Sequence, residues 1–571
     1  MAYPEAAGNS EEFESGLVAV NVKRLLCGLA GLASHLELGL LAVAIPLLLF
    51  PPAVSGTNRN RYMLAGFALV AFAWLARWLA RGEVTVRTPL DVPILLLLLG
   101  APVGLFCAVD MASALEALGK LLAGVALYYG LVNWLAPGRR RGEGRKTTRR
   151  IWYATGMLIT AGMVVAGMGL LGMRVPREKL FPVPERLYMG LPGLFKDHPN
   201  IVANPLVLVM PLCLSLFLWY EQPLSGMAGF WGRVRWVLSL VAVALFLGLA
   251  LVVMSLALAL TQSRGALLAL TAALLTVGLL RGRRLLVLIL IALAAVYLWL
   301  ALSGVSPWEV LLRLVSARWP IHQKALTLIG GYFFTGAGLN SFPLLVSGGS
   351  VPEPHAHNIF LQAWVDLGLM GFLGMAWLAI VAVLVAREAL RRAGGLLVVC
   401  HEPGLFPLAA GLCGSLVAFL VHGYAESMLW IAKPGVFIWA VLGLLVGLWR
   451  MGNGEWGMVD GRQKVKVRKR RRVLAVRKPL AIIVALVALL LMPTLAGLLC
   501  TNLGNVALRK AAIAQEGSPS WLKAAEAFSR WAVFLRPNDA TAWQRLGEVY
   551  LAEGEDRAAA EAFERAGERR R

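Results

Sequence analysis

Long apolar segments separated by short polar loops dominate the pattern along this chain. A helix needs about 20 apolar residues to cross the hydrocarbon core of a bilayer. Residues 36–501 therefore predict an all-α polytopic membrane domain with about 12–13 transmembrane helices. The predicted spans lie near 36–54, 62–80, 91–109, 113–135, 151–173, 201–220, 236–260, 265–280, 285–303, 357–386, 405–424, 429–449 and 479–501.

The segment before the first span, residues 1–35, has a different character. Residues 17–34 are apolar, but Lys23 and Arg24 interrupt them and His35 follows. This pattern favours a cytoplasmic segment with an amphipathic helix that lies on the membrane surface rather than a further span. The acidic start, "MAYPEAAGNSEEFESG", is also unlike a cleaved signal peptide.

The basic loops predict the orientation of the spans. Lys and Arg concentrate in cytoplasmic loops, and the two strongest basic runs are 138–150 and 461–478. When both are placed in the cytoplasm, the N-terminus is also cytoplasmic and the tail after 501 is extracytoplasmic. The long loops 174–200 and 304–356 then lie on the outer face. We expect a multi-pass protein of the cytoplasmic (inner) membrane.

Composition agrees with this interpretation. The chain has 571 residues, of which 58% are hydrophobic and only 15% charged, whereas soluble domains carry roughly 25% charged residues. The net charge of +23 sits in the loops between spans, so it indicates topology rather than a nucleic-acid partner. The six cysteines are scattered, without the spacing of a disulfide framework or a zinc finger.

The tail, residues 502–571, predicts a small soluble unit. Several of its residues match the tetratricopeptide pattern at the right spacing, which indicates paired helices. About one and a half units are present, fewer than the roughly three needed for a stable stack. We therefore expect the tail to pack on the membrane domain, on a second copy or on a protein partner. The matching residues are Trp543, Leu546, Gly547, Tyr550, Ala559, Phe563 and Ala566.

Conspicuous polar residues within and beside the spans converge on the predicted outer face. Arginines there run against the bias that places basic residues in the cytoplasm, so they are candidates for a site. A guanidinium presents a planar fork of donors that suits phosphate oxygens. The residues are Arg186, Asn200, Ser263, Arg264, Arg318, His355, His357, Asn358, His422 and Glu426.

The segment "PHAHN" at the mouth of the span near 357–386 carries the clearest chemistry. A neutral histidine is the commonest general base near pH 7, and a helix N-terminus disfavours the imidazolium form. His355 and His357 in extended chain would face the same side, as in a metal site, but no third ligand is near in sequence. We therefore expect one of these two histidines to act as a general base, without a metal or other cofactor. Asn200 in "HPNIVANP" is equally consistent with a helix cap, and Asp366 with an internal polar contact.

Four segments in order resemble the O-antigen ligase and O-antigen polymerase superfamily: "HPNIVANPLVLVMPL", "LTQSRGALLAL", "ARWPIHQKAL…FFTGAGLNSF" and "HAHNIFLQAWVDLGLMGFLG". The resemblance covers roughly residues 180–445. It implies a metal-independent, inverting glycosyltransferase of the GT-C type, which transfers a glycan from an undecaprenyl diphosphate carrier to an acceptor hydroxyl outside the cytoplasmic membrane. This chain has "HPNIVANP" where the family more often has Gly-Asn-Pro-Asn.

The resemblance also implies roles for individual residues. Arg264 and His357 match the essential arginine and histidine of the family, so the resemblance makes both catalytic. Arg264, Arg318 and Arg186 would bind the diphosphate. The remaining polar residues would supply supporting contacts: His355, Asn358, Ser263, Asn200, His422 and Glu426.

The residues leave several functions open. Ligase, exopolysaccharide or O-antigen polymerase and protein O-oligosaccharyltransferase share these motifs, so the acceptor is a lipid, a glycan or a protein. A transporter of lipid-linked glycans belongs to a different class. Transporters place polar residues near the bilayer midplane in broken helices repeated between halves, and the cluster at helix mouths on one face argues against that class.

Overall fold

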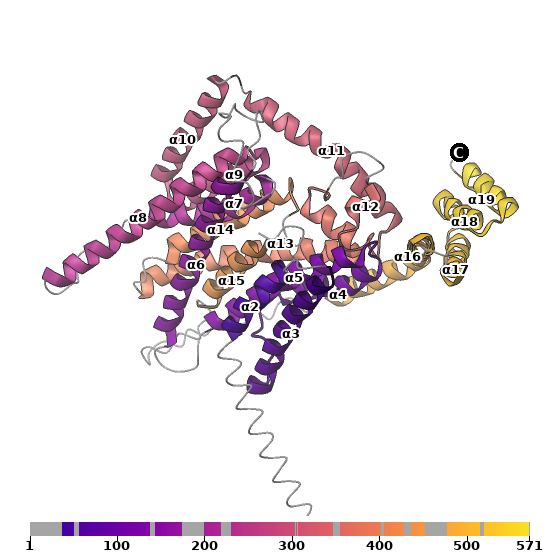
Figure 1. The fold of residues 1–571 in the computed structure, drawn as a ribbon, viewed down its shortest axis with the longest axis horizontal. Helices are drawn as coiled ribbons and strands as arrows, with labels where there is room; N and C mark the ends of the chain where they lie inside the picture. Colours follow the sequence, from indigo (N-terminus) through magenta and orange to yellow (C-terminus); the bar gives the residue numbers. More distant parts are fainter. Residues whose placement is uncertain are drawn as a thin grey trace, which may run out of the picture.

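The computed structural model describes residues 37–50, 56–136, 143–173, 199–218, 230–302, 304, 306–346, 354–400, 405–427, 435–451, 477–513 and 519–569. Across these ranges the chain forms eighteen helices, α2 to α19, and no strand. The all-α prediction is confirmed (Figure 1). The predicted interfacial segment 17–34 lies outside the described residues, as do 138–142 and 461–476 of the two strongest basic runs. The remaining residues of those runs begin α6 and α16.

Each of the thirteen predicted spans coincides with a helix. Among the described residues, nine helices are long and apolar enough to cross a membrane, so the protein is a multi-pass membrane protein. The nine are α3 (Gly56–Arg81), α5 (Met111–Leu135), α6 (Glu143–Gly172), α7 (Pro199–Phe217), α8 (Phe230–Thr261), α9 (Arg264–Arg281), α10 (Arg283–Leu302), α13 (Ile359–Cys400) and α14 (Leu405–Gly423). Three further apolar helices are shorter: α2 (Glu37–Leu49), α4 (Asp91–Phe106) and α15 (Val436–Met451).

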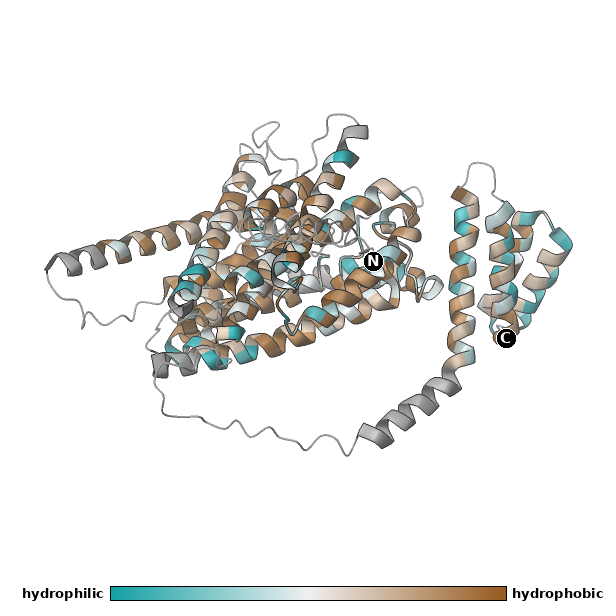
Figure 2. Cartoon of the chain, turned by 90° about the horizontal axis from the view of Figure 1, so that it is seen from below, coloured by the Kyte–Doolittle hydropathy of each residue, from teal (hydrophilic) through white to brown (hydrophobic). Residues whose placement is uncertain are grey.

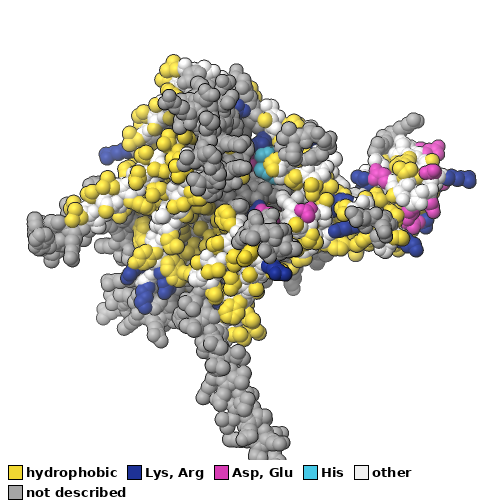
Figure 3. Space-filling model, viewed as in Figure 1, with side chains coloured by type: hydrophobic (Ala, Val, Ile, Leu, Met, Phe, Trp, Pro, Cys, Tyr) yellow, Lys and Arg dark blue, Asp and Glu magenta, His cyan; other side chains and the backbone are white. Residues whose placement is uncertain are grey.

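The core of the bundle lies around α7, α14 and α15, whose side chains are almost all buried. Trp439 of α15 is fully buried against Gly124 of α5, where an added Cβ would lie 2.1 Å from the indole. Small residues at such crossings let membrane helices approach closely. In contrast, α8 and α10 expose apolar side chains such as Leu245 and Ile291, as expected of surfaces that face lipid. Hydrophobic side chains accordingly gather over the described parts of the visible face of the bundle (Figure 3).

The predicted loop 304–356 contains two helices, α11 (Pro307–Gly331) and α12 (Phe342–Val346). The glycine-rich turn between them, residues 335–341, packs tightly against the bundle. Gly338 has φ +107°, and an added Cβ would lie 2.4 Å from the carbonyl oxygen of Cys107. Asp366 of α13 accepts a hydrogen bond from the backbone N–H of Asn340 at 3.2 Å. The expected internal contact of Asp366 is therefore confirmed.

The helix α13 bends where this turn meets it. Gly368 has φ +66° and ψ −157°, which breaks the helical geometry inside α13. A Cβ at Gly368 would lie 2.0 Å from the carbonyl oxygen of Phe334, so only glycine allows this approach. The bend and the turn together hold α11 beside the first half of α13.

The tail continues from a long helix, α16 (Arg477–Ile513), into α17 (Pro519–Leu535), α18 (Ala540–Glu553) and α19 (Asp556–Glu568). These last helices are richer in hydrophilic residues than the bundle (Figure 2). The side chain of Asn502 on α16 accepts hydrogen bonds from the backbone N–H groups of Phe334 and Thr335 at 3.0 and 2.9 Å. Arg509 donates to the carbonyl of Cys107. The second half of α16 is thus tied to the turn after α11 and to Cys107, while the tetratricopeptide assignment of the tail stays a prediction.

Candidate functional site

The loop that carries the two histidines is fixed by the start of α13. The side-chain oxygen of Asn358 accepts hydrogen bonds from the backbone N–H groups of Phe360 and Leu361 at 2.9 and 3.2 Å, so Asn358 caps the helix. Gln362, one turn further, accepts from the backbone N–H of Ala356 at 2.7 Å. His357 between them has φ +50°, a conformation that non-glycine residues adopt only when their surroundings enforce it.

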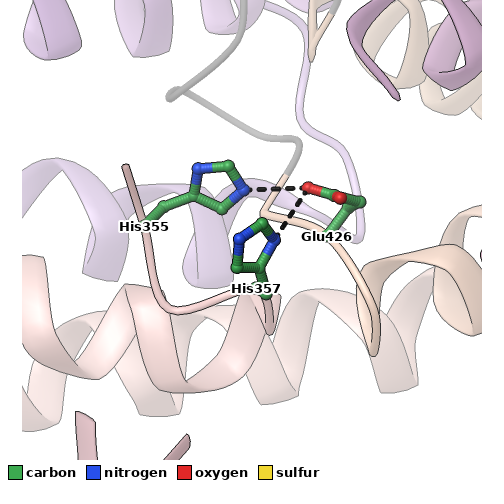
Figure 4. A group of neighbouring side chains, drawn as sticks. All are labelled: His355, His357 and Glu426. Carbon is green, nitrogen blue, oxygen red and sulfur yellow. Dashed lines mark hydrogen bonds and ion pairs between the residues drawn. The ribbon is translucent and has the colours of Figure 1, made fainter. Parts of the chain in front are cut away.

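The carboxylate of Glu426 is the centre of the cluster. Glu426 follows α14 and is buried. One carboxylate oxygen, Oε1, accepts from Asn200 Nδ2 at 2.5 Å and from a guanidinium nitrogen of Arg318 at 2.9 Å. The other oxygen, Oε2, lies 2.8 Å from His355 Nε2 and 3.2 Å from His357 Nδ1 (Figure 4). The sequence identified Glu426 only as a supporting contact, but the structure places it between four of the predicted residues.

Charge and burial set the protonation of this cluster. Burial acts to raise the pKa of Glu426, but the hydrogen bonds from His355 and His357 outweigh burial and hold its pKa well below 4.5. Burial lowers the pKa of His357 to about 4, although the carboxylate of Glu426 opposes the shift. The Glu426 carboxylate is therefore ionised at neutral pH and His357 is neutral. Arg318 balances the negative charge, so a second positive charge on His357 would have no partner.

The hydrogen bonds give the two histidines different orientations. A neutral imidazole carries one N–H, and the carboxylate accepts it. His357 donates through Nδ1, which makes Nε2 its basic nitrogen, directed away from Glu426. His355 donates through Nε2, and its Nδ1 is buried and has no hydrogen-bond partner among the described residues. The rings lie 4.0 Å apart between centroids. His357 thus has the geometry of a general base oriented by a carboxylate.

The junction between α8 and α9 lies against the same turn. Arg264 is the first residue of α9, and Ser263 before it is buried without a side-chain cap bond. An added Cβ on Gly265 would contact Ala425 at 3.0 Å and the ring of His422 at 3.7 Å. This close approach explains why glycine follows Arg264. It places the N-terminus of α9 beside the 422–426 turn, as the prediction of a common site requires.

Most of the predicted site residues lie close together, and three need correction or comment. Asn200 lies in the first turn of α7 and its Nδ2 donates to Glu426, so it positions the carboxylate rather than capping the helix. His422 is fully buried, and both its ring nitrogens have no hydrogen-bond partner among the described residues. Arg186 lies outside the described residues.

His322 is a member of the site that the sequence analysis missed. It lies on α11 four residues after Arg318, on the same helical face, and that spacing was the available signal. Its ring hydrogen-bonds to the backbone of His357, and burial lowers its pKa. The ring also lies 6.0 Å from that of Tyr424, edge to face. His322 therefore joins α11 to the loop that carries His355 and His357.

The cluster also has the donors of a metal site. The ligand atoms of His355, His357 and Glu426 lie within 4.8 Å of one another, and two histidines with a carboxylate are a known zinc donor set. However, Asn200 and Arg318 already occupy one carboxylate oxygen. Both histidines use the nitrogens that face Glu426 for hydrogen bonds to it. A metal ion would have to displace those bonds.

Comparison with known protein families supports the resemblance seen in the motifs. Residues 249–376 match the family model described as O-antigen ligase. This segment contains Arg264, Arg318, His355 and His357, and it ends within α13. No curated protein matches the chain. The matched segment thus covers the histidine loop, Arg264 and Arg318, while Asn200, His422 and Glu426 come from outside it.

Proposed function

We propose that this protein transfers a glycan from an undecaprenyl diphosphate carrier to an acceptor hydroxyl at the outer face of the cytoplasmic membrane. The observation that carries the proposal is the pairing of His357 Nδ1 with the buried carboxylate of Glu426, beside Arg318. The match to O-antigen ligase over residues 249–376 supports a glycosyltransferase of the ligase or polymerase type.

In this proposal Arg264 and Arg318 bind the diphosphate. A guanidinium has five N–H donors, and the bond from Arg318 to Glu426 uses one of them. Arg264 stands at the N-terminus of α9, where the helix dipole adds to the attraction for phosphate. Two cations together stabilise the charge that develops as the bond between the sugar and the phosphate breaks.

The acceptor hydroxyl would lie at Nε2 of His357. The imidazole takes the proton of the hydroxyl while the oxygen attacks the anomeric carbon from the side opposite the leaving diphosphate. Configuration at that carbon is inverted. Glu426 holds the ring in the tautomer with the proton on Nδ1 and stabilises the imidazolium formed in the reaction.

Reconstitution in proteoliposomes tests the proposal. Wild-type protein receives a labelled glycan on undecaprenyl diphosphate together with a lipid, a glycan or a protein acceptor, and the labelled product is measured. The variant Glu388→Gln serves as a control, because Glu388 pairs with Arg391 and Arg392 away from the cluster. Transfer to one acceptor class assigns the reaction. Movement of the carrier across the bilayer without transfer would make the protein a transporter.

A chelator distinguishes base catalysis by His357 from metal binding by the histidine pair. We expect transfer to continue after EDTA treatment, because the arginines neutralise the diphosphate in this mechanism. Loss of transfer that a divalent ion restores would assign His355, His357 and Glu426 to a metal and overturn the role of His357 as base.

A further inference from the structure

A groove with a volume of about 800 Å³ runs along one face of α6. This volume is in the range of roughly 300–1,000 Å³ that holds small-molecule ligands. The ends of α2, α7 and α15 close its other side. Met157 and Val164, which line it, are 70% and 52% exposed, so the groove opens sideways toward the surrounding lipid.

The chemistry of the groove fits an apolar chain. Its two hydroxyl groups already have partners on α6: Thr160 donates to the carbonyl of Gly156 at 2.9 Å, and Tyr153 accepts from Arg149 Nε at 2.9 Å. Three methionines line the wall: Met157, Met168 and Met173. The flexible thioether side chains of methionine adapt to irregular apolar shapes. A branched, kinked hydrocarbon would therefore find contacts here, whereas a polar ligand would lose hydrogen bonds to water without replacement.

One end of the groove adjoins the Glu426 cluster. Ile201 and Val202 line the groove, and Asn200, the preceding residue of α7, donates to Glu426 at 2.5 Å. A ligand at this end of the groove therefore lies near Asn200, which shares the carboxylate of Glu426 with Arg318 and His357. A lipid whose phosphate is attached directly to its hydrocarbon chain matches this arrangement.

We propose that the groove along α6 holds the isoprenoid chain of the donor, with the units nearest the diphosphate at the Ile201 end and later units beside Gly156. An added Cβ on Gly169 would meet Val202 at that end, and Gly156 lies thirteen residues, roughly 20 Å, further along α6, which is beyond the reach of two isoprenoid units. The inference rests on the proposed function and assigns the place of the carrier chain.

The diphosphate must reach the arginines, so its first isoprenoid units must leave the cluster through an apolar path. The groove supplies such a path. It reaches the cluster at the start of α7, where Ile201 lines the groove and the adjacent Asn200 donates to Glu426.

Filling the groove tests the assignment. An ideal Cβ on Gly156 meets no heavy atom within 4 Å, so Gly156→Phe places a ring in the groove without displacing a neighbour. Gly39 on α2 is equally open and does not line the groove, which makes Gly39→Phe the matched control. Each protein receives the same glycan on undecaprenyl diphosphate or on a diphosphate with only two isoprenoid units.

We expect Gly156→Phe to lower kcat/KM for the long-chain donor about tenfold or more, since tenfold corresponds to only about 1.4 kcal/mol of lost binding. The short-chain donor should react within about twofold of wild type, and Gly39→Phe should leave both donors unaffected. Wild-type kinetics of Gly156→Phe with the long-chain donor would overturn the groove assignment. Equal losses with both donors would overturn it as well, because they would indicate a defect in the site or in folding.

Photolabelling supplies a readout that does not depend on transfer. A polyprenyl phosphate with a diazirine beyond its second isoprenoid unit should label α6 in the wild type and in Gly39→Phe, and label it weakly in Gly156→Phe. Labelling confined to other helices would refute the groove assignment. Equal displacement of the probe by excess phospholipid would identify a site for bilayer lipid and would also refute it. Labelled α6 in a protein that transfers from neither donor would support the groove and count against the proposed function.

Discussion

Nδ1 of His357 lies 3.2 Å from Oε2 of Glu426, although sixty-nine residues separate them in the chain. His357 lies just before α13 and Glu426 lies just after α14. The packing of these two helices therefore brings the pair together. The bond fixes which nitrogen of His357 is basic. The same carboxylate also receives Arg318 and Asn200, which makes Glu426 the residue on which the geometry of the cluster depends.

Glu426→Gln should therefore lower transfer by about 10²–10⁴-fold, the range that general-base assistance supplies. The amide keeps the size of the side chain but removes the charge that balances Arg318, and it replaces one of the two acceptor oxygens by an NH2 donor. Because His357 and Glu426 act as a unit, the double variant with His357→Ala should be no slower than either single variant. Turnover numbers of the three purified proteins decide this, and multiplicative losses would show that the two residues act independently.

The two histidines should differ in their effects. His357→Ala should cost about 10²–10⁴-fold in turnover while the lipid diphosphate still binds, because the arginines remain. His355→Ala should cost markedly less, since its Nε2 faces Glu426 and its Nδ1 is buried. Turnover and donor binding are measured in parallel. An inactive His355→Ala beside a normal His357→Ala would reverse the assignment.

The pH profile should report the lowered pKa of His357. A base must be unprotonated, and burial lowers the pKa of this imidazole to about 4, below its usual value of about 6.5. As pH falls from 7 to 5, kcat/KM should therefore stay nearly constant, and it should decline only as pH approaches about 4. A decline centred near pH 6.5 would show that the base is not this buried histidine.

Arg264 should not tolerate lysine. Arg264→Ala should abolish detectable transfer, and Arg264→Lys should remain severely impaired because a point charge does not reproduce the planar fork of donors. Arg318→Ala should also be damaging, since it removes a donor to Glu426 as well as a cation. The assay is transfer at saturating donor. A lysine variant that works at nearly the wild-type rate would refute bidentate binding.

The orientation of the spans is open to labelling with a membrane-impermeant thiol reagent. In a background without native cysteines, Leu344→Cys on α12 and Glu564→Cys on α19 should react in intact cells, because both positions are exposed and predicted to be extracytoplasmic. Arg391→Cys, whose side chain is 73% exposed, should react only after permeabilisation. The reverse pattern would place the site in the cytoplasm.

The hydropathy pattern by itself determined the fold class and the positions of the apolar helices. Long apolar segments have little alternative to helix in a bilayer, because each backbone polar group must be satisfied within its own segment. This is why every predicted span coincides with a helix. The same local reasoning identified Asn358 and His357 at a helix start, since capping depends on a few neighbouring residues.

Only the tertiary structure decided which of the polar residues act together. The pairing of Glu426 with His357 and the approach of Asn200 depend on how α7, α13 and α14 pack, and no local pattern encodes that packing. His322 reached the site because α11 folds back against α13, where a turn of glycines allows backbones to touch. The chemistry of each side chain was therefore readable from the sequence. The central position of Glu426, the tautomer of His357 and the groove beside α6 follow from contacts between segments far apart in the chain.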